Sequence, residues 1–187
     1  MAWQELKQQG GTVFGEAQKQ GISPAESQAK YEQAKGFYEQ SMKMLSKDKS
    51  LDKAQRQKEE GTLRSNLSGT LAFQKEYKKA LDEAKKSEKL RPNWWKPYSR
   101  QAYALLEMAK KDGKRKTFQQ ALETYERARE LATTSTSDSP AKPAEISNMD
   151  KYMDQCKKGL AAFGGGQELA VKQPASGGGR SYFNFSV

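Results

Sequence analysis

The stretch that decides the fold is SNLSGTLAFQKEYKKALDEAKKSEKLRPNWWKPYSRQAYALLEM, residues 65–108. Two segments with helical periodicity precede Pro92 and a third follows it, because proline cannot continue a helix. Small and large side chains share one face of each of the first two segments: Leu67, Ser68, Leu71, Ala80, Ala84 and Ser87. Small residues let two helices cross closely, and large ones fill the gaps between them. The stretch therefore predicts an antiparallel helix pair that ends near Leu90 and a further helix that begins near Trp94.

The same spacing recurs on both sides of this pair. We expect helices over about 94–111 and 117–132 downstream, and over about 2–20 and 24–45 upstream. The matching positions are Leu6, Gly10, Val13, Ala34, Tyr38, Ser41, Tyr98, Ala102, Leu105, Ala121, Tyr125 and Ala128. Three helix pairs in register predict a repeat array, and the alternative is an ordinary six-helix bundle without a repeat.

The composition changes after the sixth predicted helix. Residues 133–144, TTSTSDSPAKPA, are small, polar and contain proline, which is typical of a linker. A seventh, amphipathic helix is expected over 145–163, with Cys156 as a packed thiol on its apolar stripe. Residues 164–187 form a Gly-rich tail with an aromatic tip, Tyr182-Phe183-Asn184-Phe185, and we expect the tail to be flexible and disordered when free.

Several classes of site are excluded by composition. The chain of 187 residues has no His and a single Cys, so we expect no zinc site and no disulfide framework. No nucleophile–base arrangement or phosphate-binding loop appears, so we expect a protein that is not an enzyme and needs no cofactor or metal. No apolar run is long enough for a membrane span, and MAWQELKQQ lacks the layout of a secretory signal. We expect a cytoplasmic location, with the nucleus or a cilium as alternatives.

The charge is concentrated in the first part of the chain. The formal charge is +10, and residues 133–187 contribute only +1 (six basic and five acidic side chains), which leaves +9 on residues 1–132. A basic body indicates an anionic partner, namely an acidic peptide, a nucleic acid or a membrane surface. The run KKDGKRK, 110–116, has the composition of a nuclear-localisation or nucleic-acid patch, but basic turns between helices are common.

These motifs resemble the tetratricopeptide-repeat (TPR) co-chaperones. Residues 65–108 are similar to the second and third repeats of the heat-shock organizing adaptor family, and LKQQGGTVF, 6–14, is similar to that family's LKxxGNxxF opening. The resemblance covers about residues 3–132. It implies an all-α, right-handed superhelical array of three helix pairs, 1–132, followed by a capping helix. The array departs from the family's spacing by insertions near 15–33, 46–62 and 109–117.

The resemblance also implies a carboxylate clamp for the last residue of a chaperone tail ending in Glu-Glu-Val-Asp. Lys7, Asn66, Lys96 and Arg100 fall on four clamp positions, whereas Gly11 replaces the asparagine of the fifth. The chemistry of the residues also favours a carboxylate ligand. Lys96 and Arg100 share one helix face, where their charges repel unless an anion lies between them. The alternative is a solvated basic face.

Further expectations concern the groove and its neighbours. We expect Gly11, Phe14 and Tyr103 to lie along the groove as well. Trp94 and Trp95 are expected to be packing anchors between repeats, and ligand stacking is the alternative.

The function that follows is a TPR adaptor that binds the acidic tail of a seventy- or ninety-kilodalton heat-shock chaperone, with a second partner held by the 164–187 tail. One alternative is a scaffold in a larger assembly, for example cytoskeletal or ciliary, whose groove holds another segment. A second alternative is RNA binding, which no single-strand-binding motif supports.

Overall fold

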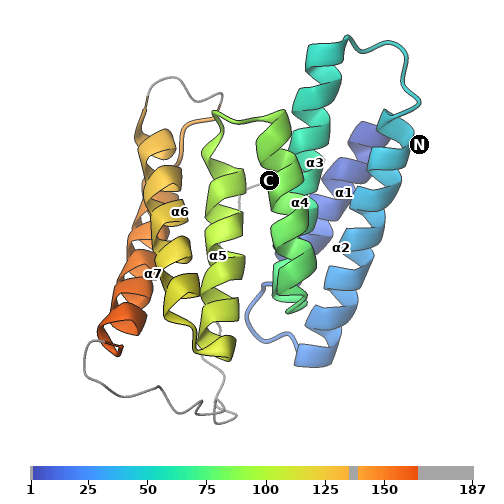
Figure 1. Ribbon diagram of the computed structural model, residues 1–187. Helices are drawn as coiled ribbons and strands as arrows, with labels where there is room; N and C mark the ends of the chain where they lie inside the picture. Colours follow the sequence, from blue (N-terminus) through green and yellow to red (C-terminus); the bar gives the residue numbers. More distant parts are fainter. Residues whose placement is uncertain (1, 135–138, 164–187) are drawn as a thin grey trace.

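The computed structural model describes residues 2–134 and 139–163, and this part of the chain is all helical (Figure 1). The expected tail, 164–187, and part of the expected linker, 135–138, lie outside the described residues. The helices are α1 (Trp3–Glu16), α2 (Pro24–Leu45), α3 (Lys53–Phe73), α4 (Tyr77–Leu90), α5 (Trp95–Asp112), α6 (Arg115–Thr133) and α7 (Pro143–Ala161).

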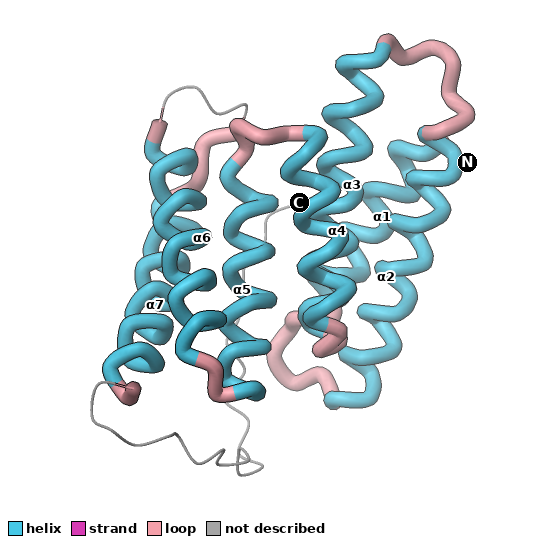
Figure 2. Tube along the Cα trace, viewed as in Figure 1, coloured by secondary structure: helices cyan, strands magenta, loops and turns pink. Residues whose placement is uncertain are grey.

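The helices stack in chain order as antiparallel hairpins, α1–α2, α3–α4 and α5–α6, with α7 against α6 (Figures 1 and 2). The odd-numbered helices also contact one another, α1 with α3, α3 with α5 and α5 with α7. Within the described residues, α2, α4 and α6 make no such contacts with each other. The odd-numbered helices therefore form the inner layer of a curved array, and their facing sides line its groove. This confirms the predicted helical repeat array with a seventh helix covering its end.

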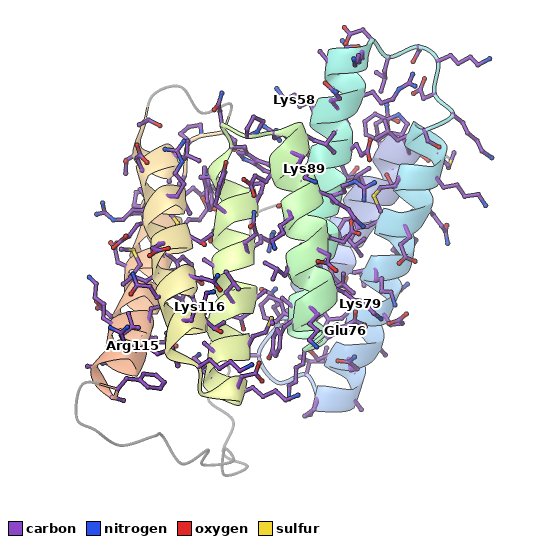
Figure 3. The ribbon with its side chains drawn as sticks, viewed as in Figure 1. Lys58, Glu76, Lys79, Lys89, Arg115 and Lys116 are labelled. Carbon is purple, nitrogen blue, oxygen red and sulfur yellow. The ribbon has the colours of Figure 1, made fainter. Side chains whose placement is uncertain are left out.

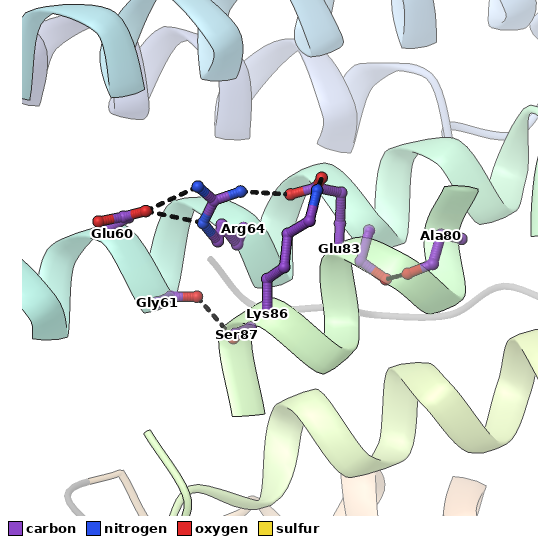
Figure 4. Close-up of polar contacts among 8 residues, drawn as sticks. Glu60, Gly61, Arg64, Ala80, Glu83, Lys86 and Ser87 are labelled. Atoms are coloured by element: carbon purple, nitrogen blue, oxygen red, sulfur yellow. Dashed lines mark hydrogen bonds and ion pairs between the residues drawn. The ribbon is translucent and has the colours of Figure 1, made fainter. Parts of the chain in front are cut away.

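Polar contacts between small residues hold the central hairpin together. Ser87 Oγ of α4 donates a hydrogen bond to the Gly61 carbonyl of α3 at 2.7 Å (Figure 4). At the other end of the pair, Ser68 Oγ donates to the Ala80 carbonyl at 2.7 Å. All four residues are buried, which shows that the small residues of the repeat pattern lie where the helices cross.

Charged contacts reinforce the same hairpin at its edge. Arg64 of α3 bridges Glu60, on its own helix, and Glu83 of α4, with N···O distances of 2.7 and 2.8 Å (Figure 4). Other basic side chains are exposed on the surface of the array. Figure 3 shows exposed basic side chains on three helices, α3, α4 and α6: Lys58, Lys79, Lys89, Arg115 and Lys116.

The insertions lengthen helices more than they form loops. The expected helices over 94–111 and 117–132 leave a basic loop of five residues, 112–116, and this prediction is wrong. α5 continues to Asp112, so only Gly113 and Lys114 separate it from α6. Gly113 has φ +61°, a left-handed conformation that ends α5 at little steric cost. Of the insertion near 46–62, residues 46–52 connect α2 to α3 and the rest forms the first turns of α3. Asp52 caps α3 by accepting a hydrogen bond from the Gln55 N–H at 2.8 Å.

Other helix ends differ by a few residues. α1 ends at Glu16 instead of near residue 20, ahead of a turn in which Gly21 has φ +83°. α7 begins at Pro143 instead of residue 145, since proline fits the first turn and Glu145 accepts a hydrogen bond from the Lys142 N–H at 2.8 Å.

The core confirms the predicted packing roles. Trp94 and Trp95 are buried, and the indole Nε1 of Trp95 donates to the Ser139 carbonyl at 2.9 Å, so both are packing anchors. Cys156 is a buried free thiol whose pKa burial raises to about 11. Among the described helices, none is both long and apolar enough to cross a membrane.

Candidate peptide-binding groove

The four inner helices share a seven-residue spacing. Each carries a polar residue and, two turns later, an aromatic one: Lys7 and Phe14 on α1, Asn66 and Phe73 on α3, Lys96 and Tyr103 on α5, Glu145 and Tyr152 on α7. Residues seven apart lie on the same helix face, about 10 Å apart along the axis. The inner layer therefore has two bands, which we call the polar band (Lys7, Asn66, Lys96, Arg100 and Glu145) and the aromatic row (Phe14, Phe73, Tyr103 and Tyr152).

Arg100 lies at the centre of the polar band, between α5 and α3. Its side chain is buried, and Nε donates to Ser65 Oγ at 3.4 Å. Gly69 makes this position possible, because a Cβ built there would lie 2.2 Å from Arg100 Nη1. Burial lowers the pKa of Arg100 to about 10, while Tyr38 and Glu145 act in the opposite direction. The guanidinium is therefore held against the inner face of α3, on the same face as Asn66.

Lys96 lies one turn before Arg100 and is covered by aromatic rings. Its Nζ is 6.0 Å from the ring centroid of Trp94 and 5.6 Å from that of Trp95. The side chain is only 12% exposed. Burial and the neighbouring Arg100 lower the pKa of Lys96 to about 8, although Glu145 opposes the shift. Two cations thus share a poorly solvated site. The spacing of residues 96 and 100 predicts their shared face but not their burial.

Glu145 of α7 brings a carboxylate to these two cations. Its Oε1 is 3.9 Å from Lys96 Nζ, and its side chain is 8% exposed. Glu145 also stabilises the charged form of Arg100. The sequence reasoning missed this residue. The seven-residue spacing between Glu145 and Tyr152, the same as on the other inner helices, is the signal that points to it.

Lys7 and Asn66 differ in whether another residue of the chain already binds their polar group. Lys7 forms an ion pair with Glu59 of α3 at 2.7 Å, so its charge is compensated within the chain. Glu59, in the lengthened part of α3, was also missed. Asn66 is buried, and within the described residues its Nδ2 has no hydrogen-bond acceptor. A buried donor without an acceptor costs about 1–3 kcal/mol, so an oxygen that reaches Nδ2 is favoured there.

Gly11, at the position of the fifth clamp residue, is buried in α1. It has no side chain to offer a ligand. The structure therefore brings Lys96 and Arg100 together beside α3, where Asn66 lies on the inner face. Lys7 forms an ion pair with Glu59. Gly11 provides no side-chain amide at the fifth position.

The aromatic row crosses the whole inner layer. Ring centroids lie 5.5 Å apart for Phe14 and Phe73, 6.4 Å for Phe73 and Tyr103, and 5.5 Å for Tyr103 and Tyr152. Tyr31 of α2 joins it, stacked on Phe73 at 5.3 Å. Phe14 and Tyr103 were expected in the groove, whereas the continuity of the row across helices was not.

A cavity of about 690 Å³ opens at the aromatic end of the inner layer. Five aromatic side chains line it: Tyr31, Phe73, Tyr77, Tyr103 and Tyr152. Polar residues of α5, α7 and the turn after α1 also line it, among them Gln18, Glu107, Lys110 and Gln155. Within the described residues, no group of His, Cys, Asp and Glu is arranged to hold a metal ion.

Comparison with solved structures identifies the architecture. The chain matches the TPR2B domain of yeast Sti1, solved in a pHsp70 complex, with a TM-score of 0.58 over 83% of this chain and 96% of that one. It also matches the TPR domain of Sgt2 from Aspergillus fumigatus, with a TM-score of 0.60 over 96% of this chain and 92% of that one. Sequence identity is 18% in both comparisons. This chain has the tetratricopeptide-repeat fold.

The TPR fold explains the two-layer arrangement, because stacked hairpins place the first helix of each pair on the concave side. The expected repeat array is confirmed, and the six-helix bundle without a repeat is excluded. No known family profile and no curated protein match the sequence. The likeness to the TPR domains therefore lies in the three-dimensional arrangement of the helices, and the roles of the polar band are argued from its own geometry.

Proposed function

We propose that this protein is a non-catalytic TPR adaptor of the cytoplasm that binds the carboxylate of an acidic peptide, of the type found at the Glu-Glu-Val-Asp end of heat-shock chaperones. Lys96 and Arg100 are its main contacts, and Asn66 supplies an amide donor. The observation that carries the proposal is the burial of two cations within one helical turn, where desolvation and mutual repulsion lower the pKa of Lys96 to about 8. A bound carboxylate offsets both effects.

The chemistry of each contact suits a carboxylate. Arg100 presents a planar guanidinium that forms paired hydrogen bonds with two oxygens, whereas Lys96 acts as a point charge. Asn66 Nδ2 gains the acceptor that the described residues do not provide. The shared architecture with the Sti1 TPR2B domain, solved with pHsp70, supports the choice of a chaperone tail as the ligand.

The site differs from a complete clamp in two respects. Gly11 offers no amide, and Glu59 already pairs with Lys7. These two observations favour a second candidate function, a TPR scaffold in a larger assembly whose groove holds a different segment. A chain end other than Glu-Glu-Val-Asp, or an internal acidic side chain, would then contact Lys96 and Arg100.

Calorimetric titration with a peptide ending in Glu-Glu-Val-Asp tests the proposal. We expect binding that weakens with added salt, and a loss of about tenfold or more in Arg100→Met and in Lys96→Met, since a charged hydrogen bond contributes about 1.5–3 kcal/mol. Lys89→Met, which removes an exposed charge from the outer helix α4, is the matched control and should bind as the wild type does. The same peptide with an amidated end should bind more weakly.

The result that rejects the chaperone-tail proposal is the absence of heat at high micromolar peptide, or equal affinity in all three variants. Recovery of a chaperone-free assembly from cell extract by the wild type, but not by Arg100→Met, would instead support the scaffold.

A further inference from the structure

The cavity at the aromatic end of the groove is lined by five aromatic side chains together with polar ones. Its lining includes rings from five different helices, α2, α3, α4, α5 and α7. The rings of Tyr31, Phe73, Tyr103 and Tyr152 pack edge-to-face or stacked on their neighbours. Aromatic pairs in these geometries are favourable beyond the burial of their area. An extended segment with two or three aromatic residues is therefore the ligand that this cavity fits.

The chain itself contains such a segment. Residues 180–185, Arg-Ser-Tyr-Phe-Asn-Phe, include all the aromatic residues that follow Phe163. Phe183 and Phe185 are two apart, so in an extended conformation both point to the same side. In the same conformation Tyr182 would point to the other side. Its hydroxyl suits the polar part of the lining.

The length of the connecting chain suits this contact. Gln155 of α7 lines the cavity, and Phe163, at the end of the described part, follows it by eight residues, or about 12 Å of helix. Tyr182 follows Phe163 by 19 residues of largely Gly-rich sequence (182 − 163). For Gly-rich sequences of that length, the root-mean-square span is about 24 Å. The span is about twice the distance along α7, so the segment can reach the cavity and has a high effective concentration there.

We propose that residues 180–185 bind in the aromatic cavity of their own chain, with Phe183 and Phe185 against the aromatic row. The groove is then occupied in cis at its aromatic end, whose Tyr103 lies two helical turns after Lys96 on α5. This proposal goes beyond the carboxylate-binding function and does not depend on it. Its consequence is that a longer peptide, anchored at the polar band and extending along the groove, competes with the segment for the aromatic row.

A binding experiment in trans tests the proposal on the full chain. The probe is a fluorescent, amide-ended peptide of residues 180–187, which lacks the carboxylate that the polar band would hold. The receptors are the wild-type chain and the variant Phe183→Ser/Phe185→Ser, whose own segment can no longer fill the cavity. We expect the variant to bind the peptide and the wild type to bind it about tenfold or more weakly, because a tethered segment competes at an effective concentration near millimolar.

Two further variants test the site within the Phe183→Ser/Phe185→Ser background. Adding Tyr103→Leu, in the cavity lining, should weaken peptide binding at least fivefold. Adding Phe37→Leu, on α2 outside that lining, is the matched control and should leave binding unchanged. Circular dichroism establishes that each variant is folded.

Three results overturn the proposal: no peptide binding to the double variant, equal binding to the double variant and the wild type, or light scattering that shows the segment joining two copies of the chain. Failure of this experiment and failure of the proposed function are distinguishable. The acidic peptide reports on Lys96 and Arg100, whereas the 180–187 peptide reports on the aromatic row.

Discussion

Glu145 Oε1 of α7 lies 3.9 Å from Lys96 Nζ of α5, so the helix that covers the end of the array also adds an acidic group to the polar band. A carboxylate oxygen of the same Glu145, Oε2, accepts the Lys142 N–H at the start of α7. The segment that leads into α7 is also tied to α5, because Trp95 Nε1 donates a hydrogen bond to the Ser139 carbonyl. The candidate site and the capping helix are thereby one structural unit.

Glu145→Gln is expected to raise the affinity for an acidic peptide about threefold to tenfold, because it removes a negative charge beside the two cations that would hold the ligand. Glutamine preserves the hydrogen bond to Lys142 N–H, so α7 should still form. Calorimetry with the Glu-Glu-Val-Asp peptide measures the change. Glu123→Gln, on the exposed face of α6, is the control. A lower affinity in Glu145→Gln would show that Glu145 helps to position the cations and does not compete with the ligand.

The titration of Lys96 should be visible in the pH dependence of stability. The folded chain loses this proton near pH 8, whereas an unperturbed lysine loses it near 10.5. Between these values the unfolded chain binds more protons, so the free energy of unfolding rises with pH. The contribution is at most about 3 kcal/mol at the top of this window. Urea unfolding at pH 7.5 and 9.5 should show a gain in the wild type that is smaller in Lys96→Met. An equal gain in both would place the titration elsewhere.

Gly69→Ala should destabilise the protein and weaken peptide binding together. The new Cβ would lie 2.2 Å from Arg100 Nη1, so the buried guanidinium must move. Overpacking of this kind costs about 1–3 kcal/mol. Gly36→Ala, on α2 with no atom within 4 Å of the new Cβ, is the opposite case and should stabilise the protein by about 0.5–1 kcal/mol. Denaturant midpoints of the two variants compare the effects, and a Gly69→Ala variant as stable as Gly36→Ala would contradict the packing argument.

A double-mutant cycle should show how far Lys7 takes part in ligand binding. Because Glu59 pairs with Lys7 at 2.7 Å, Lys7→Met alone should lower the affinity for the acidic peptide less than threefold. In the Glu59→Gln background the same change should lower it more, since Lys7 is then available to the ligand. Equal effects in both backgrounds would mean that the ion pair does not control Lys7.

The sequence by itself determined the hairpins and their order. Ala80, Ala84 and Ser87 recur at helical spacing, and this local pattern predicts which faces cross closely wherever the helices are placed. The pairing of Lys96 with Arg100 was equally accessible, because residues four apart on one helix always share a face.

Only the tertiary structure decided what these cations meet. Lys7 meets Glu59, and Lys96 meets Glu145, across separate helices that periodicity cannot place relative to one another. The shift in the pKa of Lys96 also depends on tertiary structure, since it results mainly from burial beneath side chains brought together by the stacking of the repeats. Spacing along a helix is fixed by local geometry, whereas charge, desolvation and ring contacts at the groove depend on how the helices pack.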